Sequence, residues 1–312
     1  MSRPVRFCLA SALALLLFFS STPHAANAGD RGPNLASVNA AVGPLNGDGI
    51  RFGKHANRVV PIASITKLMM AMVVLDSGEP LDEWLTIRER DYAVNRNAYS
   101  RMRIGSELTR GDLLRIALMS SENLASDVLA MHHPGGRHAF VAAMNEKAAE
   151  LGMHSSRFVD PHGLSEENIA SAADLLAMVR AAHKYPTIRE YSTTPGFQAR
   201  FRSPRYDLQY GNTNALVHAG SWGVTLSKTG YINEAGRCLV MVANIDGEPT
   251  AMVFLDSFGS RTPLGDASRA RQWLRTGERG SVAGAALDYE RSRTASIRER
   301  SIVSSAEFKD SL

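Results

Sequence analysis

Cysteine is scarce in this sequence. The 312 residues contain two cysteines, Cys8 and Cys238. Cys8 lies in an N-terminal segment that we expect to be removed, so the mature chain would hold Cys238 alone. A single cysteine cannot form an internal disulfide, and Cys238 lies in an apolar run typical of a buried strand. A disulfide scaffold and a redox role without a partner are therefore excluded.

The sequence also lacks a hydrophobic run long enough for a comfortable membrane span. Its longest N-terminal candidate, Cys8–Phe19, is too short. Arg3 and Arg6 precede this run, and the small residues of Ala26-Asn-Ala28 follow it. This arrangement predicts a cleavable secretory signal over residues 1–28 and a periplasmic protein, with an uncleaved anchor as the alternative. Removing 28 residues from 312 leaves 284, enough for one large domain or two interleaved subdomains.

Strong charge and metal-binding motifs are missing too. The formal net charge is +4 and falls to +2 once Arg3 and Arg6 are removed, so no nucleic-acid partner is indicated. His132, His133 and His138 cluster around residues 134–136, but their spacing is not H-E-x-x-H and no carboxylate completes a site. We therefore expect no metal and no cofactor.

Three short motifs are present, in a fixed order. They are Ser64-Ile-Thr-Lys67, Ser121-Glu-Asn123 and Lys228-Thr-Gly230. Each alone is commonplace, because S-x-x-K often marks an ordinary helix start and the other two often mark turns. Together they supply a nucleophile, a base, a proton relay and an anion-binding strand. This set predicts a serine acyltransferase that opens amide bonds without a histidine.

The spacing within the motifs fits these roles. Ser64 and Lys67 are three residues apart, which places them on one face of a helix. Lys67 can act as a base only as a neutral amine, a form favoured by burial and by a nearby cation such as Lys228. Ser121 could pass a proton to the leaving group, and Asn123 could hold a substrate amide. The third motif lies in an alternating run that predicts an edge strand, along which a peptide could bind at Thr229 and Gly230.

The remaining pattern predicts an α/β (α+β) fold with strands at both ends of the chain. The apolar run Leu68–Leu75 indicates a fully buried helix, which would place Lys67 in a dry environment. Residues 80–190 are mostly helical and predict an inserted helical lobe within a catalytic domain of residues 29–275. Residues 276–312 balance six basic against six acidic residues. We expect a disordered tail there, or else a weak helix that touches a membrane or a partner.

The chain resembles the penicillin-recognising DD-peptidases of low molecular mass, and it is most similar to their periplasmic D-alanyl-D-alanine endopeptidase branch. The similarity spans roughly residues 33–275 and rests on five stretches: Pro61–Met69, Met119–Asn123, Phe158–Leu164, Asn212–Leu216 and Ser227–Arg237. It implies an antiparallel sheet flanked by helices, a peptidoglycan substrate, and acylation by β-lactams at Ser64. It also implies an oxyanion hole formed by the backbone N–H groups of Ser64 and Tyr231. His162 departs from the family, whose members usually have threonine there.

Three other functions share part of this pattern. A β-lactamase of class A needs a glutamate three residues before an asparagine, but Ser165-Glu-Glu-Asn168 has serine at that point. A non-catalytic penicillin-binding module is disfavoured because no catalytic residue is missing. A carboxypeptidase would benefit from a cation that binds the terminal carboxylate. By alignment we expect Asp266 to stand where that cation would be, and we therefore expect an endopeptidase.

Overall fold

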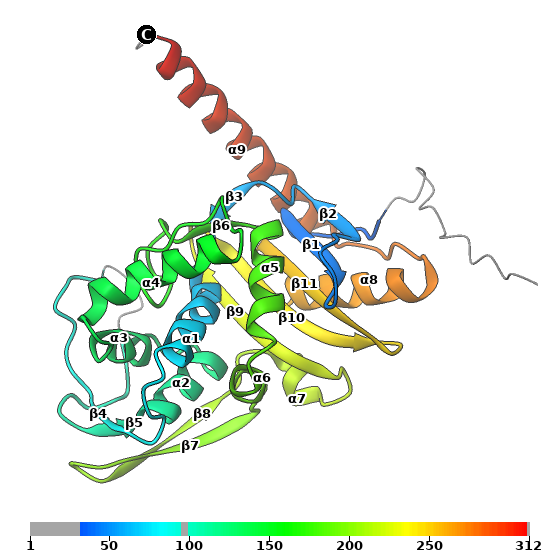
Figure 1. Ribbon diagram of the computed structural model, residues 1–312. Helices are drawn as coiled ribbons and strands as arrows, with labels where there is room; N and C mark the ends of the chain where they lie inside the picture. The colour runs from blue at the N-terminus through cyan, green and yellow to red at the C-terminus, as the bar shows by residue number, and fades with distance from the viewer. Residues whose placement is uncertain (1–31, 95–98, 311–312) are drawn as a thin grey trace, which may run out of the picture. The chain divides into compact units, whose positions relative to one another are not determined.

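A five-stranded antiparallel sheet joins the two ends of the catalytic region. The computed structural model describes residues 32–94 and 99–310, so the expected signal segment 1–28 lies outside the described residues. The sheet has the order β2-β1-β11-β10-β9 (Figure 1). Its strands are β1 Asn39–Pro44, β2 Phe52–Lys54, β9 Val224–Ile232, β10 Gly236–Ile245 and β11 Glu248–Ser257. The predicted fold class, with one sheet built from both ends of the chain, is confirmed.

Helices cover both faces of this sheet. Helix α5 (Ala172–Ala182) packs on β1 and β11, and α8 (Thr262–Thr276) packs on β10 and β11. Because side chains alternate along a strand, neighbouring residues belong to different apolar clusters. Ala41 and Val253 join the cluster on the α5 face, whereas Ala40 and Phe254 join the cluster on the α8 face. The sheet is therefore the middle layer of three.

The helical region contacts the α5 face and is centred on α1. Helix α1 (Thr66–Asp76) is buried from Thr66 to Val74, as the unbroken apolar run predicts. Helices α2, α3, α4 and α5 lie around it, and all of them belong to the same compact unit as the sheet, Gly32–Leu312. The remaining helices are η1 Ala63–Ile65, α2 Arg110–Met119, α3 Asn123–Met131, α4 Gly136–Glu150, α6 Pro186–Ser192 and α7 Ala215–Ala219. Three two-stranded sheets complete the region: β3 Val59–Pro61 with β6 Ile169–Ser171, β4 Trp84–Thr86 with β5 Glu107–Thr109, and β7 Gly196–Phe201 with β8 Tyr206–Gly211.

The C-terminal segment differs from the expected disordered tail. Residues Gly284–Asp310 form helix α9, and its first turns are anchored to the sheet (Figure 1). The Asp256 carboxylate is 2% exposed at the end of β11. It accepts hydrogen bonds from the Tyr289 hydroxyl at 2.6 Å and from Arg293 Nε at 2.8 Å. A buried carboxylate needs such partners, so the arginine that interrupts the apolar pattern of this segment is its anchor.

No helix within residues 32–94 and 99–310 is both long enough and apolar enough to cross a membrane.

Candidate active site

Ser64 and Lys67 lie where a short helical turn enters α1. Ser64 is in the turn η1 and is 8% exposed, and Lys67 is fully buried in the first turn of α1. The Thr66 hydroxyl donates to the Ala63 carbonyl oxygen at 2.8 Å, which ties the turn to the helix. Lys67 Nζ lies 3.0 Å from Ser64 Oγ. The predicted pairing of the two side chains on one face is therefore present.

The Lys67 amine has two other close oxygen neighbours. Nζ donates to Asn123 Oδ1 and to the His162 carbonyl oxygen, each at 2.7 Å. Burial lowers the pKa of Lys67 from 10.5 to about 7, although the nearby Asp160, Glu122 and Asp127 oppose that shift. A neutral amine donates two hydrogens, which these two oxygens accept, and its lone pair is then left to accept the Ser64 proton. The arrangement suits proton transfer from Ser64 Oγ to Lys67 Nζ.

The second motif lies on the predicted loop between α2 and α3. Ser121 has a positive φ of 62°, and Glu122 caps α3 by accepting a hydrogen bond from the Ala125 N–H at 2.5 Å. Asn123 begins α3 and reaches Lys67. Within the part of the chain that the structure describes, the Ser121 hydroxyl has no hydrogen bond to Lys67 or Ser64. The relay role of Ser121 therefore stays a prediction.

The third motif lies on β9, an edge strand of the large sheet as predicted. A Cβ added at Gly230 would lie 3.1 Å from the Ser64 nitrogen and 3.2 Å from the Ile62 carbonyl oxygen. The strand therefore passes directly against the turn that carries Ser64, and a larger residue would push the two apart. The Thr229 hydroxyl lies 2.6 Å from that of Thr213.

Lys228 is the second buried amine of the site. It is 1% exposed, and its Nζ donates to the Thr229 carbonyl oxygen at 2.8 Å. Burial, and then the charge of Lys67, lowers the pKa of Lys228 well below its usual value. The charge of Lys67 thus disfavours protonation of Lys228, while the expected effect of Lys228 on Lys67 stays a prediction. Tyr231 follows on the same strand, is 41% exposed and donates to Asn233 Oδ1 at 2.8 Å.

A loop that the three motifs do not include completes the surroundings of Lys67. It runs from Asp160 to Asn168, and its His162 carbonyl is one of the two oxygens that hold Nζ. Gly163 has φ +83°, and a Cβ there would lie 1.9 Å from the Ala63 carbonyl oxygen. The Asp160 carboxylate shapes the loop by accepting N–H groups of His162, Gly163 and Ser165 at 2.5–3.0 Å. The contact is made by a backbone carbonyl, which leaves no signal in side-chain motifs.

The His162 side chain is itself buried in a polar network. Its Nδ1 accepts the Leu164 N–H at 3.1 Å, and its Nε2 lies 2.8 Å from the Tyr92 hydroxyl. Tyr92 in turn donates to Asp127, which also pairs with Arg90. Burial lowers the pKa of His162 below 6.5, and an Nδ1 that accepts a backbone N–H must be unprotonated. His162, the residue that differs from the threonine usual in the similar family, is therefore neutral, and its ring holds the loop in place through these hydrogen bonds.

Asp266 is not part of this site, and the expectation that it lies beside the substrate is wrong. Pro263 occupies the first turn of α8, so the segment is a helix rather than a loop. The fully buried Asp266 carboxylate accepts the N–H groups of Ala36 at 2.9 Å and Ser37 at 2.8 Å, and it pairs with Arg269. Asp266 thereby ties the backbone segment just before β1 to helix α8, which lies on the sheet face opposite α1.

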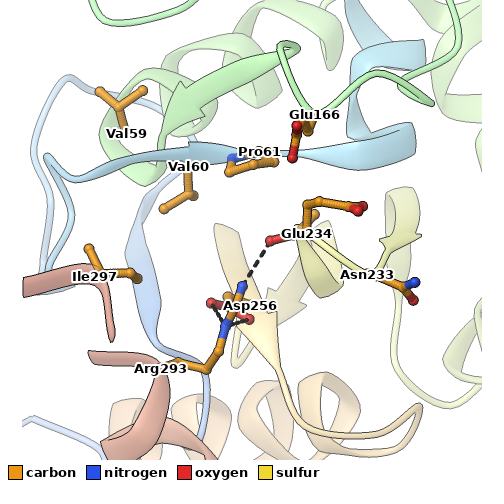
Figure 2. A pocket seen from close by; sticks show the side chains of 10 residues that line it. Val59, Val60, Pro61, Glu166, Asn233, Glu234, Asp256, Arg293 and Ile297 are labelled. Atoms are coloured by element: carbon orange, nitrogen blue, oxygen red, sulfur yellow. Dashed lines mark hydrogen bonds and ion pairs between the residues drawn. The ribbon is translucent and has the colours of Figure 1, made fainter. Parts of the chain in front are cut away.

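Two cavities flank the site on the α9 side. The larger one, about 890 Å³, is lined by residues including His162, Tyr231, Glu166 and Glu234. Its neighbour, about 610 Å³, shares those two glutamates. Figure 2 shows that the Arg293 side chain, which lines this smaller cavity, lies between Asp256 and Glu234. Arg293 Nη2 donates a hydrogen bond to the Glu234 carbonyl oxygen at 2.8 Å. Among the described residues, no group of three or more His, Cys, Asp or Glu side chains could hold a metal ion.

Comparisons with known proteins agree with this geometry. The family peptidase S11, described as D-alanyl-D-alanine carboxypeptidase, matches residues 30–259. A D-alanyl-D-alanine endopeptidase of Pseudomonas aeruginosa is 47% identical over 86% of each chain. One of Escherichia coli is 46% identical over 85% of this chain and 86% of that protein. The crystal structure of the Streptomyces K15 DD-transpeptidase superposes with a TM-score of 0.73 at 28% identity, over 78% of this chain and 98% of that one.

Proposed function

The chain belongs to the D-alanyl-D-alanine carboxypeptidase family of serine peptidases, and from this premise we propose that it cleaves the D-alanine-containing cross-links of peptidoglycan through an acyl-enzyme on Ser64. The observation that carries the proposal is the buried Lys67 amine. It lies 3.0 Å from the Ser64 hydroxyl and has a pKa lowered to about 7. A serine needs such a base to become a nucleophile.

Acylation follows from the contacts at Lys67. Ser64 Oγ attacks the carbonyl carbon of a D-alanine while its proton passes to Lys67 Nζ. The carbonyl oxygen becomes an oxyanion, which the backbone N–H groups of Ser64 and Tyr231 would stabilise. The tetrahedral intermediate collapses, the C–N bond breaks, and the leaving amine takes a proton from Lys67 through Ser121. Ser64 is left as an ester.

Deacylation runs the same steps with water. Lys67 is neutral again after acylation, so it can take a proton from an attacking water molecule and return it to Ser64 Oγ. Asn123, Thr229 and the backbone at Gly230 would orient the peptide, which lies along the open edge of β9. Lys228 would hold this strand in place through its hydrogen bond to the Thr229 carbonyl oxygen. β-Lactams would enter the same step, with their amide carbonyl attacked by Ser64.

The endopeptidase assignment rests on the two relatives at 47% and 46% identity. Carboxypeptidases are also among the relatives, including one of Bacillus subtilis at 30% identity, so trimming of terminal D-alanine is the alternative. Asp266 no longer contributes to this choice. A periplasmic location agrees with a cell-wall substrate and with the expected signal segment.

Digestion of purified muropeptides tests the proposal. Cross-linked dimers should be lost before terminal D-alanine is released from monomeric pentapeptides, and Ser64→Ala should do neither. Mass spectrometry after exposure to penicillin should show one adduct, on the peptide that contains Ser64. Rapid release of D-alanine with dimers intact would make the enzyme a carboxypeptidase. An adduct that persists in Ser64→Ala would overturn the nucleophile, and rapid turnover of penicillin would favour a β-lactamase.

A further inference from the structure

Two exposed arginines border the site on the side of Asn123, where no sequence motif marked them. Arg101 and Arg103 point outward on either side of Met102, which is 5% exposed and part of the core. The Arg101 guanidinium lies 4.8 Å from the centre of the Tyr210 ring, and that of Arg103 lies 4.6 Å from the centre of the Tyr206 ring. We call these four residues the arginine rim.

Both arginines are held in place but lack an acidic partner. Arg101 Nη2 donates to the Gln209 carbonyl oxygen at 2.7 Å, and the backbone N–H of Arg103 donates to the Tyr206 hydroxyl at 2.8 Å. Across residues 32–94 and 99–310, neither guanidinium has a carboxylate within salt-bridge distance. The neighbouring Arg202, by contrast, is paired with Glu107 at 2.7 Å. The charges of Arg101 and Arg103 are therefore available to a ligand, and their orientation is fixed beforehand.

The arginine rim is joined to the site at two points. Burial raises the pKa of Glu122, the residue between Ser121 and Asn123, and the Ser100 hydroxyl, next to Arg101, opposes that shift. Tyr210 lies three residues before Thr213, whose hydroxyl is 2.6 Å from that of Thr229. Burial and then the charge of Glu122 also raise the pKa of Tyr210, so the Arg101–Tyr210 end of the rim adjoins the Ser121–Asn123 motif.

The other flank of the site has a different charge. Three glutamates, Glu166, Glu167 and Glu234, line its larger cavity together with Arg137. An anionic group of a bound peptide would be repelled there and attracted to the rim. Building on the proposed function, we infer that the arginine rim is a subsite for a free carboxylate of the peptidoglycan peptide, on a residue that precedes the scissile D-alanine bond.

A matched pair of synthetic peptides tests this subsite. Both end in D-Ala-D-Ala, and they differ only in a carboxylate or a carboxamide on the side chains of the two preceding residues. The enzyme should prefer the carboxylate peptide about tenfold or more in kcat/KM, as expected for one charge-assisted contact. Arg101→Gln with Arg103→Gln should reduce that preference to about one. Arg200→Gln, an exposed arginine on β7, is the control and should keep it.

The outcomes separate this inference from the proposed function. Equal use of both peptides by the parent enzyme, or an unchanged preference in the double variant, would overturn the subsite. Penicillin acylation of Ser64 and cleavage of the carboxamide peptide should persist in the double variant, because neither needs the rim. The proposed function fails if the parent leaves cross-linked dimers intact, whereas a parent that cleaves dimers but neither synthetic peptide is still an endopeptidase. Direct binding of both peptides to Ser64→Ala, measured by calorimetry, then decides the subsite on its own.

Discussion

Changing the pH of the acylation reaction tests whether the Lys67 amine accepts the serine proton. Only the neutral amine can do so, and the pKa of Lys67 is lowered to about 7. The neutral fraction is then about 10% at pH 6 and about 90% at pH 8, so the rate of acylation should rise about ninefold between these values. The measurement is the second-order rate constant for a fluorescent penicillin, followed by gel or intact mass.

Controls separate this effect from a general loss of structure. Lys67→Arg keeps the charge but cannot release a proton near neutral pH, so it should be inactive at every pH. Circular dichroism should show the parent folded throughout the range. A rate constant that varies less than twofold between pH 5.5 and 8.5, or one that falls as the pH rises, would refute the role of Lys67 as the base.

The same pKa has a consequence for stability. An unfolded chain keeps the proton on this lysine up to about pH 10.5, whereas the folded chain loses it above about 7. Because the unfolded state binds more protons between these values, the free energy of unfolding should rise with pH across this window. The slope approaches about 1.4 kcal/mol per pH unit above the folded pKa, and the rise from pH 7 to 9 is about 2.3 kcal/mol. Lys67→Met should lack this part of the slope, as measured by urea unfolding.

Three other substitutions test the packing around the site. Gly163→Ala would place a Cβ 1.9 Å from a backbone oxygen at positive φ, so it should cost about 3 kcal/mol or more and abolish acylation; a melting temperature within 2 °C of the parent (roughly 1 kcal/mol) would contradict this. Asp266→Asn weakens a charged cluster that joins β1 to α8, so it should cost about 2 kcal/mol in urea unfolding. The variant should keep the preference between muropeptide dimers and monomers unchanged. A shift towards monomers would show that Asp266 does lie near the bound substrate. Asp256→Asn weakens the anchor of α9, so limited proteolysis should cut residues 284–297 faster while penicillin still acylates the enzyme; unchanged proteolysis would show that other contacts hold the helix.

Much of the fold could be predicted because its signals are local. The apolar run of α1 indicated a buried helix, and the alternating run around Lys228 indicated an edge strand. The spacing of the first motif also predicted that Ser64 and Lys67 would meet, and Lys67 Nζ lies 3.0 Å from Ser64 Oγ. The contact between Lys67 and Asn123 was not predicted. Periodicity and side-chain chemistry suffice for such features.

One wrong expectation had a local signal against it, and the other differences depend on tertiary contacts. Asp266 was placed by alignment in a loop, although Thr262-Pro263 is a typical helix start and was available as a signal. In the tail, Arg293 interrupts the apolar pattern, and only the position of buried Asp256, 37 residues earlier, gives it a partner. The His162 carbonyl could not be predicted, because every residue has a carbonyl and only the fold decides which one meets Lys67.

The strand order also determines when a newly made chain can become active. Strand β1 is among the first elements to be synthesised. Its partner is β11, the last strand of the sheet in sequence order, where Leu255 lies opposite Asn39. A nascent chain therefore contains Ser64 and Lys67 long before the strand that closes the sheet exists. Until β9, β10 and β11 have been made, Gly230 cannot press against the Ser64 turn, and such distant pairings form late and slowly. A partly synthesised chain of this design therefore carries Ser64 and Lys67 before the strand that shapes their site exists.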